Sequence, residues 1–138
     1  LPQAEAALAA GVQFALAPGT SPMIIKRFQE AGVPFMPGVA TPSDIERALS
    51  LGCRRQKFFP AGTLGGVSAL KAMSAPYAHL GIEFCPTGGV NLDNLQEYLS
   101  LPQVFTVGGT WLATREDIEQ QHWEAITAKA AAAVKAAA

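Results

Sequence analysis

Short apolar runs alternate with amphipathic stretches along the whole chain. Five of the runs carry a phenylalanine and recur every 21 to 26 residues, at Phe14, Phe35, Phe58, Phe84 and Phe105. Most of them are followed at once by Pro or Gly, which is typical of the turn after a strand. Helix-like patterns lie between the runs, over residues 21–28, 41–49, 65–73 and 91–99. The spacing predicts strand–helix units around a parallel sheet.

This pattern predicts an α/β fold. Right-handed crossovers would wind the units into an open sheet or into a (βα)8 TIM barrel. A complete barrel of this period needs about 170 to 200 residues. We therefore expect residues 1–138 to form a single domain that holds the last five βα units and lacks the first three strands. The chain opens without Met, on a helix entry at Leu1-Pro2, and looks like a piece of a longer protein.

Composition narrows the possible partners. Hydrophobic residues make up 49% of the chain and charged residues 15%, which is typical of a folded core. The net charge of -1 favours neither nucleic acid nor an anionic membrane. No apolar run approaches the roughly 18 residues of a membrane span. Cys53 and Cys85 predict two reduced, buried thiols in a cytoplasmic protein, and the isolated His79 and His122 predict no metal site.

Lys57 stands inside an apolar run, which is unusual for a lysine. Side chains alternate along a strand, so Lys57 and Phe59 share one face, as do Cys85 and Thr87 on the next strand. These side chains point to the barrel axis if the recurrent phenylalanines pack outward under the helices. Burial lowers the pKa of a lysine, and a neutral amine can form a Schiff base with a carbonyl substrate. The alternative is a lysine that reaches the rim or pairs with a carboxylate.

Two runs end in paired glycines, Gly88-Gly89 and Gly108-Gly109, the second followed by Thr110. Glycines between a strand and a helix let backbone N–H groups approach a phosphate. The loops after the last two strands of a TIM barrel often bind phosphate, and these would be those loops. Glycine is also common at such turns for backbone reasons alone.

Several other residues carry structural expectations. Glu83 lies near the start of its strand, far from the Lys57 end, and is expected to be structural. Trp111 and Trp123 are expected to pack, Lys129 to be solvated, and a terminal helix over 128–138 to lie on the outside. Asp93 and Asn94 are expected in the first turn of a helix.

In its motifs the sequence resembles the 2-keto-3-deoxy-6-phosphogluconate (KDPG) aldolase and 4-hydroxy-2-oxoglutarate aldolase family, class I aldolases of the Entner–Doudoroff pathway. The resemblance runs from Leu1 to about Leu112, in order and spacing, and its motifs include the segments 13–19, 34–41, 57–61, 65–67, 84–90 and 107–111. It implies a (βα)8 barrel, a homotrimer, a small phosphorylated keto-acid substrate and no cofactor.

The resemblance also implies roles for individual residues. Lys57 matches the lysine that forms the Schiff base with the substrate, Phe59 an aromatic residue beside the pyruvyl group, and Thr87 a hydroxyl near the lysine. A phosphate cradle is matched by Gly88, Gly89, Gly109 and Thr110, the last replacing a serine that is common in the family. The family's general-base glutamate, and the arginine that binds the substrate carboxylate, lie on a strand that this chain lacks.

The predicted activity is that of a lyase that cleaves KDPG to pyruvate and glyceraldehyde 3-phosphate and also acts on 4-hydroxy-2-oxoglutarate. One alternative is a non-covalent phosphate-binding barrel, such as an isomerase or a synthase, which needs the glycine cradle but no reactive lysine. Another is a catalytically impaired fragment, or part of an assembly in which other chains supply the missing strands.

Overall fold

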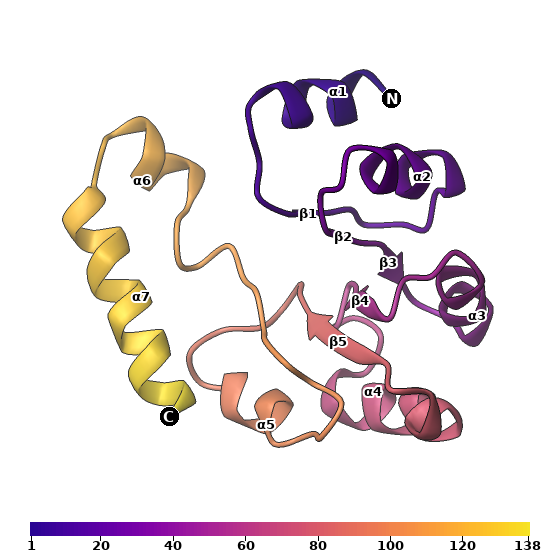
Figure 1. The fold of residues 1–138 in the computed structure, drawn as a ribbon. Helices are drawn as coiled ribbons and strands as arrows, with labels where there is room; N and C mark the ends of the chain where they lie inside the picture. Colours follow the sequence, from indigo (N-terminus) through magenta and orange to yellow (C-terminus); the bar gives the residue numbers. More distant parts are fainter.

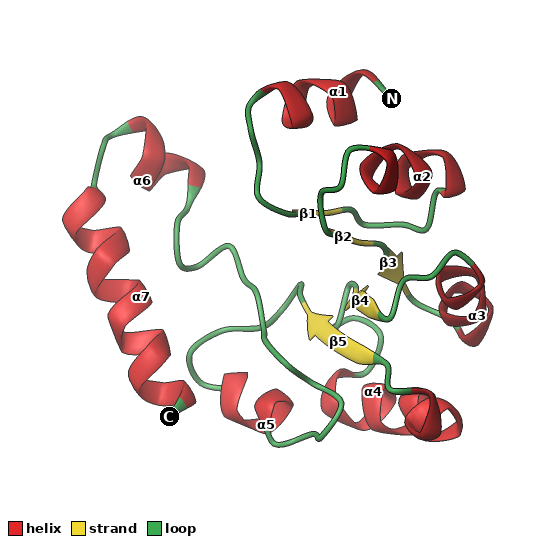
Figure 2. Cartoon of the chain, viewed as in Figure 1, coloured by secondary structure: helices red, strands yellow, loops and turns green.

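A computed structural model describes residues 1–138 and gives an α/β arrangement (Figure 1, Figure 2). The strands are β1 (Ala15–Leu16), β2 (Phe35–Met36), β3 (Gly38–Val39), β4 (Arg55–Phe58) and β5 (Glu83–Pro86). The helices are α1 (Pro2–Ala9), α2 (Pro22–Glu30), α3 (Pro42–Ser50), α4 (Gly66–Ser74), α5 (Leu95–Leu99), α6 (Arg115–Glu119) and α7 (Trp123–Ala137), with a 3-10 helix over Ala75–Leu80. None of the helices combines the length and apolar character needed to cross a membrane.

Every strand pair is parallel, as the strand–helix spacing predicts. β1 pairs with β2, and β3, β4 and β5 form a three-stranded sheet in that order. The fifth apolar run continues the curve with two isolated parallel bridges, Phe84 to Val104 and Thr87 to Gly108, rather than a regular strand. In Figure 1 the strands form an inner arc, and α2, α3 and α4 lie along its outer side.

Local hydrogen bonds from side chains explain where two of the helices begin. Thr41 caps α3, because its hydroxyl accepts the Asp44 N–H and the Asp44 carboxylate accepts the Thr41 N–H. The expected helix over 91–99 begins only at Leu95. The Asn91 side chain accepts the N–H groups of Asp93 and Asn94 and holds a turn there, so neither residue lies in the first helical turn.

The core lies between the inner arc and the outer helices. Phe58 and Phe84 are fully buried there, together with Ile45, Leu70 and Leu95. Phe35 also faces the helices, since its ring stacks on Phe28 with centroids 4.8 Å apart. Three of the five recurrent phenylalanines therefore pack outward, as predicted.

The other two phenylalanines point inward, so the condition of outward packing does not hold for them. Ala15 is the register partner of the outward-facing Phe35, so the preceding Phe14 faces the concave inner side of the strand arc. Its side chain is 59% exposed there. Val104 bridges to the outward-facing Phe84, so the following Phe105 also faces inward, with its ring 4.9 Å from the Arg55 guanidinium carbon.

Helix α7 lies on the outside, as predicted, and is held at two places along its length. Near its C-terminus Gln96 of α5 donates to the Ala136 carbonyl, and Ala133 and Ala136 pack against the core. Near the middle of α7, Lys129 Nζ lies 2.6 Å from the Asp117 carboxylate of α6, so the prediction of a solvated Lys129 was wrong. Trp123, at the start of α7, is 55% exposed and does not pack as predicted.

Candidate active site

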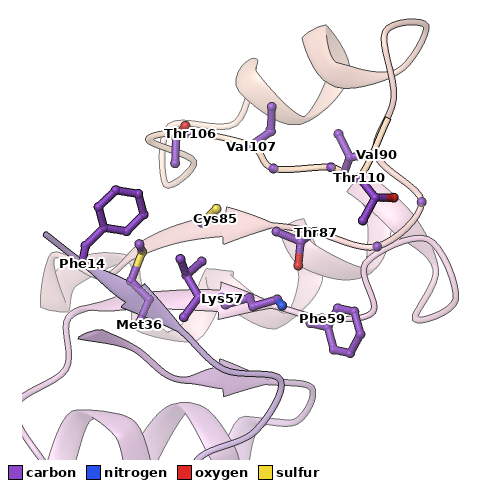
Figure 3. A pocket seen from close by; sticks show the side chains of 15 residues that line it. Phe14, Met36, Lys57, Phe59, Cys85, Thr87, Val90, Thr106, Val107 and Thr110 are labelled. Carbon is purple, nitrogen blue, oxygen red and sulfur yellow. The ribbon is translucent and has the colours of Figure 1, made fainter. Parts of the chain in front are cut away.

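A cavity of about 510 Å³ opens on the inner side of the strand arc (Figure 3). All seven residues that the sequence singles out line it together: Lys57, Phe59, Thr87, Gly88, Gly89, Gly109 and Thr110. They come from β4 and the residue after it, from the loop after β5 and from the segment over 104–110 that bridges to β5 and this loop. Parallel strands that end at the same edge bring these residues together, although more than 50 positions separate the first from the last.

Lys57 lies on the inner face of β4. Its backbone N–H donates to the Pro37 carbonyl at 2.8 Å, and its register partners are Gly38 of β3 and Cys85 of β5. None of the ion pairs in the structure includes Lys57. Burial is the main influence on this amine and lowers its pKa below the ordinary value. The alternative of a lysine paired with a carboxylate was therefore wrong.

Cys85 forms an uncharged wall of the same cavity. Burial raises the pKa of its thiol to about 11, although the neighbouring Lys57 acts in the opposite direction. The thiol therefore stays protonated near neutral pH and contributes bulk rather than charge. Neither Cys85 nor Cys53 forms a disulfide, and both are buried, as predicted.

Thr87 presents a hydroxyl oxygen that is buried and has no hydrogen-bond partner. The Thr87 methyl group, Cγ2, faces the neighbouring segment, because a methyl group added at Gly108 would lie only 3.0 Å from it. In Figure 3 the hydroxyl points towards Lys57 and Phe59. A buried polar atom without a partner is unusual, and here it lines a cavity that a polar ligand group can enter.

Two glycine loops, over residues 88–89 and 108–110, also line the cavity. The N–H groups of Gly88, Gly89, Gly109 and Thr110 make no hydrogen bond within the chain. The carbonyls of the first loop are held, because the Gly62 N–H donates to Gly88 at 2.8 Å and the Asn94 amide donates to Gly89 at 2.9 Å. Gly88 and Gly89 both have φ of +85°, which favours glycine. Free N–H groups on loops that line one cavity can bind an anion.

Glu83 lies outside the cavity, at the N-terminal end of β5, whereas the cavity lies at the C-terminal end of that strand. Its carboxylate forms an ion pair with Arg55 at 2.7 Å, on the same face as the Phe105 ring. Glu83 therefore pairs with Arg55 away from Lys57, at the distance from the site that the sequence predicts.

Three apolar cavity residues, Phe14, Leu16 and Met36, were not predicted as site residues. They come from β1, β2 and the residue before β1, and Figure 3 shows Phe14 and Met36 on the side of the cavity nearest these strands. The signal that could have found them is alternation along the strand, once the register Ala15 to Phe35 is known.

Comparisons with known proteins identify similar chains. The family model described as KDPG and KHG aldolase matches residues 2–129. The 2-dehydro-3-deoxy-phosphogluconate aldolase of Dickeya dadantii (strain 3937) is 43% identical over 94% of this chain and 60% of its own length. The KHG/KDPG aldolase of Escherichia coli (strain K12) is 38% identical over 93% of this chain and 59% of its own length.

A solved structure is also similar. It is the KDPG aldolase from Legionella pneumophila with pyruvate captured at low pH as a covalent carbinolamine intermediate. The two structures superpose with a TM-score of 0.82 at 40% identity, over 91% of this chain and 60% of the other. This chain thus spans about 60% of the length of the relatives it matches.

Proposed function

Because the chain belongs to the KDPG and KHG aldolase family, we propose that it forms the Schiff-base centre of a class I aldolase. The observation that carries the proposal is Lys57, an amine without a carboxylate partner and with a lowered pKa, on the wall of a cavity of about 510 Å³. The substrate is KDPG, which is cleaved to pyruvate and glyceraldehyde 3-phosphate. The name of the Escherichia coli relative supports 4-hydroxy-2-oxoglutarate as a second substrate.

The neutral Lys57 amine attacks the keto carbon of the substrate and forms a carbinolamine, which loses water to give a protonated imine. The imine accepts the electron pair of the C3–C4 bond when that bond breaks, and the C4 hydroxyl loses its proton as it becomes the aldehyde. The product on the enzyme is the enamine of pyruvate. Protonation at C3 and hydrolysis of the imine release pyruvate and restore the amine.

The remaining cavity residues bind the two ends of the substrate. Phe59 packs beside the pyruvyl group, and the unpartnered Thr87 hydroxyl donates to one of its oxygens. The phosphate accepts from the free N–H groups of Gly88, Gly89 and Gly109 and from the hydroxyl of Thr110. The chain's net charge of -1 leaves the attraction of this phosphate to local donors rather than to a basic surface.

Proton transfer needs a general base, and no Asp or Glu lines the cavity. We infer that the base and the group that binds the substrate carboxylate are supplied by residues outside this chain. Loss of a general base costs about 10² to 10⁴-fold in rate, so the 138 residues alone form the imine but turn over slowly.

The proposal also covers the setting of the site. The five βα units form the last part of a (βα)8 barrel, and residues 1–138 belong to a single domain. The parallel strands that curve around the cavity support this arrangement. The whole enzyme is a cytoplasmic homotrimer, in keeping with the resemblance of its motifs and with its two unpaired cysteines.

Borohydride reduction in the presence of pyruvate tests the proposal, with intact-mass and peptide-mass analysis of the product. We expect one reduced pyruvyl adduct, on Lys57, no adduct in Lys57→Met, and an unchanged adduct in Lys71→Met, which alters an outer helix. Absence of the adduct from a chain shown to be folded would overturn the proposal and leave a non-covalent phosphate-binding site or an impaired fragment of the aldolase.

A further inference from the structure

Trp111 lies directly against the second glycine loop. A methyl group added at Gly109 would lie 1.8 Å from Cζ3 and 1.9 Å from Cε3 of the Trp111 indole, so the ring covers the Gly109 Cα. The same methyl group would lie 2.8 Å from the Val90 carbonyl oxygen, at the end of the first glycine loop. Gly109 is therefore enclosed between the indole and the other half of the anion-binding loops.

The indole is itself anchored away from the cavity. Trp111 packs against the hydrophobic core and, with Leu112, faces α5 and α7 across an apolar groove that Leu95 and Ala133 also line. Its position thus depends on packing behind the loop rather than on contact with a ligand in the cavity.

Strand pairing alone does not hold this loop. The bridged segment has its last pairing at Gly108, where the Gly108 N–H donates to the Pro86 carbonyl at 3.1 Å. The N–H groups of Gly109 and Thr110 make no hydrogen bond within the chain. What remains to fix their position is the indole packed against Gly109.

We propose that Trp111 is a positioning residue for the substrate phosphate, acting through Gly109 and Thr110. This inference rests on the proposed function, because it gives the two free N–H groups a phosphate to bind. Ligands with a phosphate depend on the indole. Pyruvate does not, because it binds at Lys57, Phe59 and Thr87 and has no phosphate for the Gly109 and Thr110 N–H groups.

The test measures the half-saturating concentration for borohydride trapping with KDPG and with pyruvate. In Trp111→Leu we expect the value for KDPG to rise about tenfold or more, because small displacements of positioned groups are costly, and the value for pyruvate to stay within about twofold. Trp111→Phe, which keeps an aromatic ring, should lie between the two. Trp123→Leu, which alters the exposed tryptophan of α7, is the matched control and should change neither value.

A second measurement covers the case in which Trp111→Leu fails to fold. In Trp123→Phe the indole of Trp111 is the single tryptophan, and we expect its fluorescence to change saturably on titration with inorganic phosphate. The inference is overturned if Trp111→Leu weakens KDPG and pyruvate equally, or if phosphate leaves the fluorescence unchanged. Failure of the proposed function is distinct, since the wild-type chain would then give no pyruvate adduct while phosphate still changed the fluorescence.

Discussion

The Lys57 ammonium lies 4.3 Å from the centre of the Phe59 ring. The two residues are two positions apart on an extended chain, so both side chains face the cavity. The ring exerts two opposite influences on the amine. Its quadrupole attracts the charged form, while its bulk excludes water and disfavours that form. Burial prevails overall, because the pKa of Lys57 lies below its ordinary value of 10.5.

Phe59→Leu separates these two influences, because leucine keeps most of the apolar bulk and removes the aromatic quadrupole. We expect the pKa of Lys57 to fall further, since the charged amine loses an attraction of about 0.5–1 kcal/mol. Only the neutral amine attacks pyruvate, so the rate of imine formation, measured by borohydride quenching at successive times, rises with pH through the pKa. The midpoint of that rise should lie below 10.5 in the wild type and lower still in Phe59→Leu.

Phe105→Leu is the control for this experiment. The Phe105 ring also lies against a cation, but that cation is the Arg55 guanidinium, which stays charged over the pH range used. Its replacement should leave the midpoint where it is in the wild type. A midpoint that moves upward in Phe59→Leu would mean that water exclusion is the ring's main effect, contrary to the prediction.

Gly88→Ala tests the packing of the first glycine loop. The added methyl group would lie 3.1 Å from Cε2 of Phe59 and 3.2 Å from the Pro60 Cα, at a φ of +85° that alanine rarely adopts. We expect the free energy of unfolding in urea to fall by about 1–3 kcal/mol. Trapping on Lys57 should also slow, because the displaced ring touches the amine.

Gly19→Ala is the matched control, because a methyl group there meets nothing within 4 Å and the glycine does not have a positive φ. Its free energy of unfolding should stay within about 0.5 kcal/mol of the wild type or rise slightly, since alanine restricts the unfolded chain. Equal losses in the two variants would show that steric contact with Phe59 is not the cause.

The cavity could be predicted from the sequence because its main residues lie on two neighbouring strands whose faces alternate regularly. β4 and β5 pair through four positions with Lys57 opposite Cys85, so the inward faces predicted for the two runs by alternation lie side by side. The start of a helix could also be predicted where the signal is local, as with the Thr41 cap and the proline after it.

The features that could not be predicted from the sequence depend on contacts between distant parts of the chain. Phe14 and Phe105 carry the same local pattern as Phe58, yet a register one residue different turns their side chains to the other face. Likewise Trp111 and Trp123 cannot be distinguished locally. One packs on the core behind a glycine loop, and the other is exposed at the start of α7.

Asp117 joins α6 to α7, and acid should weaken that connection. Its carboxylate accepts from Lys129 Nζ at 2.6 Å and from the Thr114 hydroxyl at 2.7 Å, and these bonds hold its pKa well below the ordinary value. Because the carboxylate titrates lower in the folded chain than in the unfolded chain, its stabilisation is fully present above about pH 4. It is lost as the pH falls towards the folded-state pKa.

Asp117→Asn should therefore lower the free energy of unfolding at pH 7, and the gap to the wild type should narrow as the pH is lowered from about 4. Urea unfolding measured between pH 7 and pH 2 gives both quantities. Glu119→Gln on the same helix is the control, because its ion pair with Arg115 is exposed and such pairs contribute about 0–1 kcal/mol. A gap that is constant with pH would contradict the prediction, because the carboxylate's charge would then have no part in holding α7 against α6.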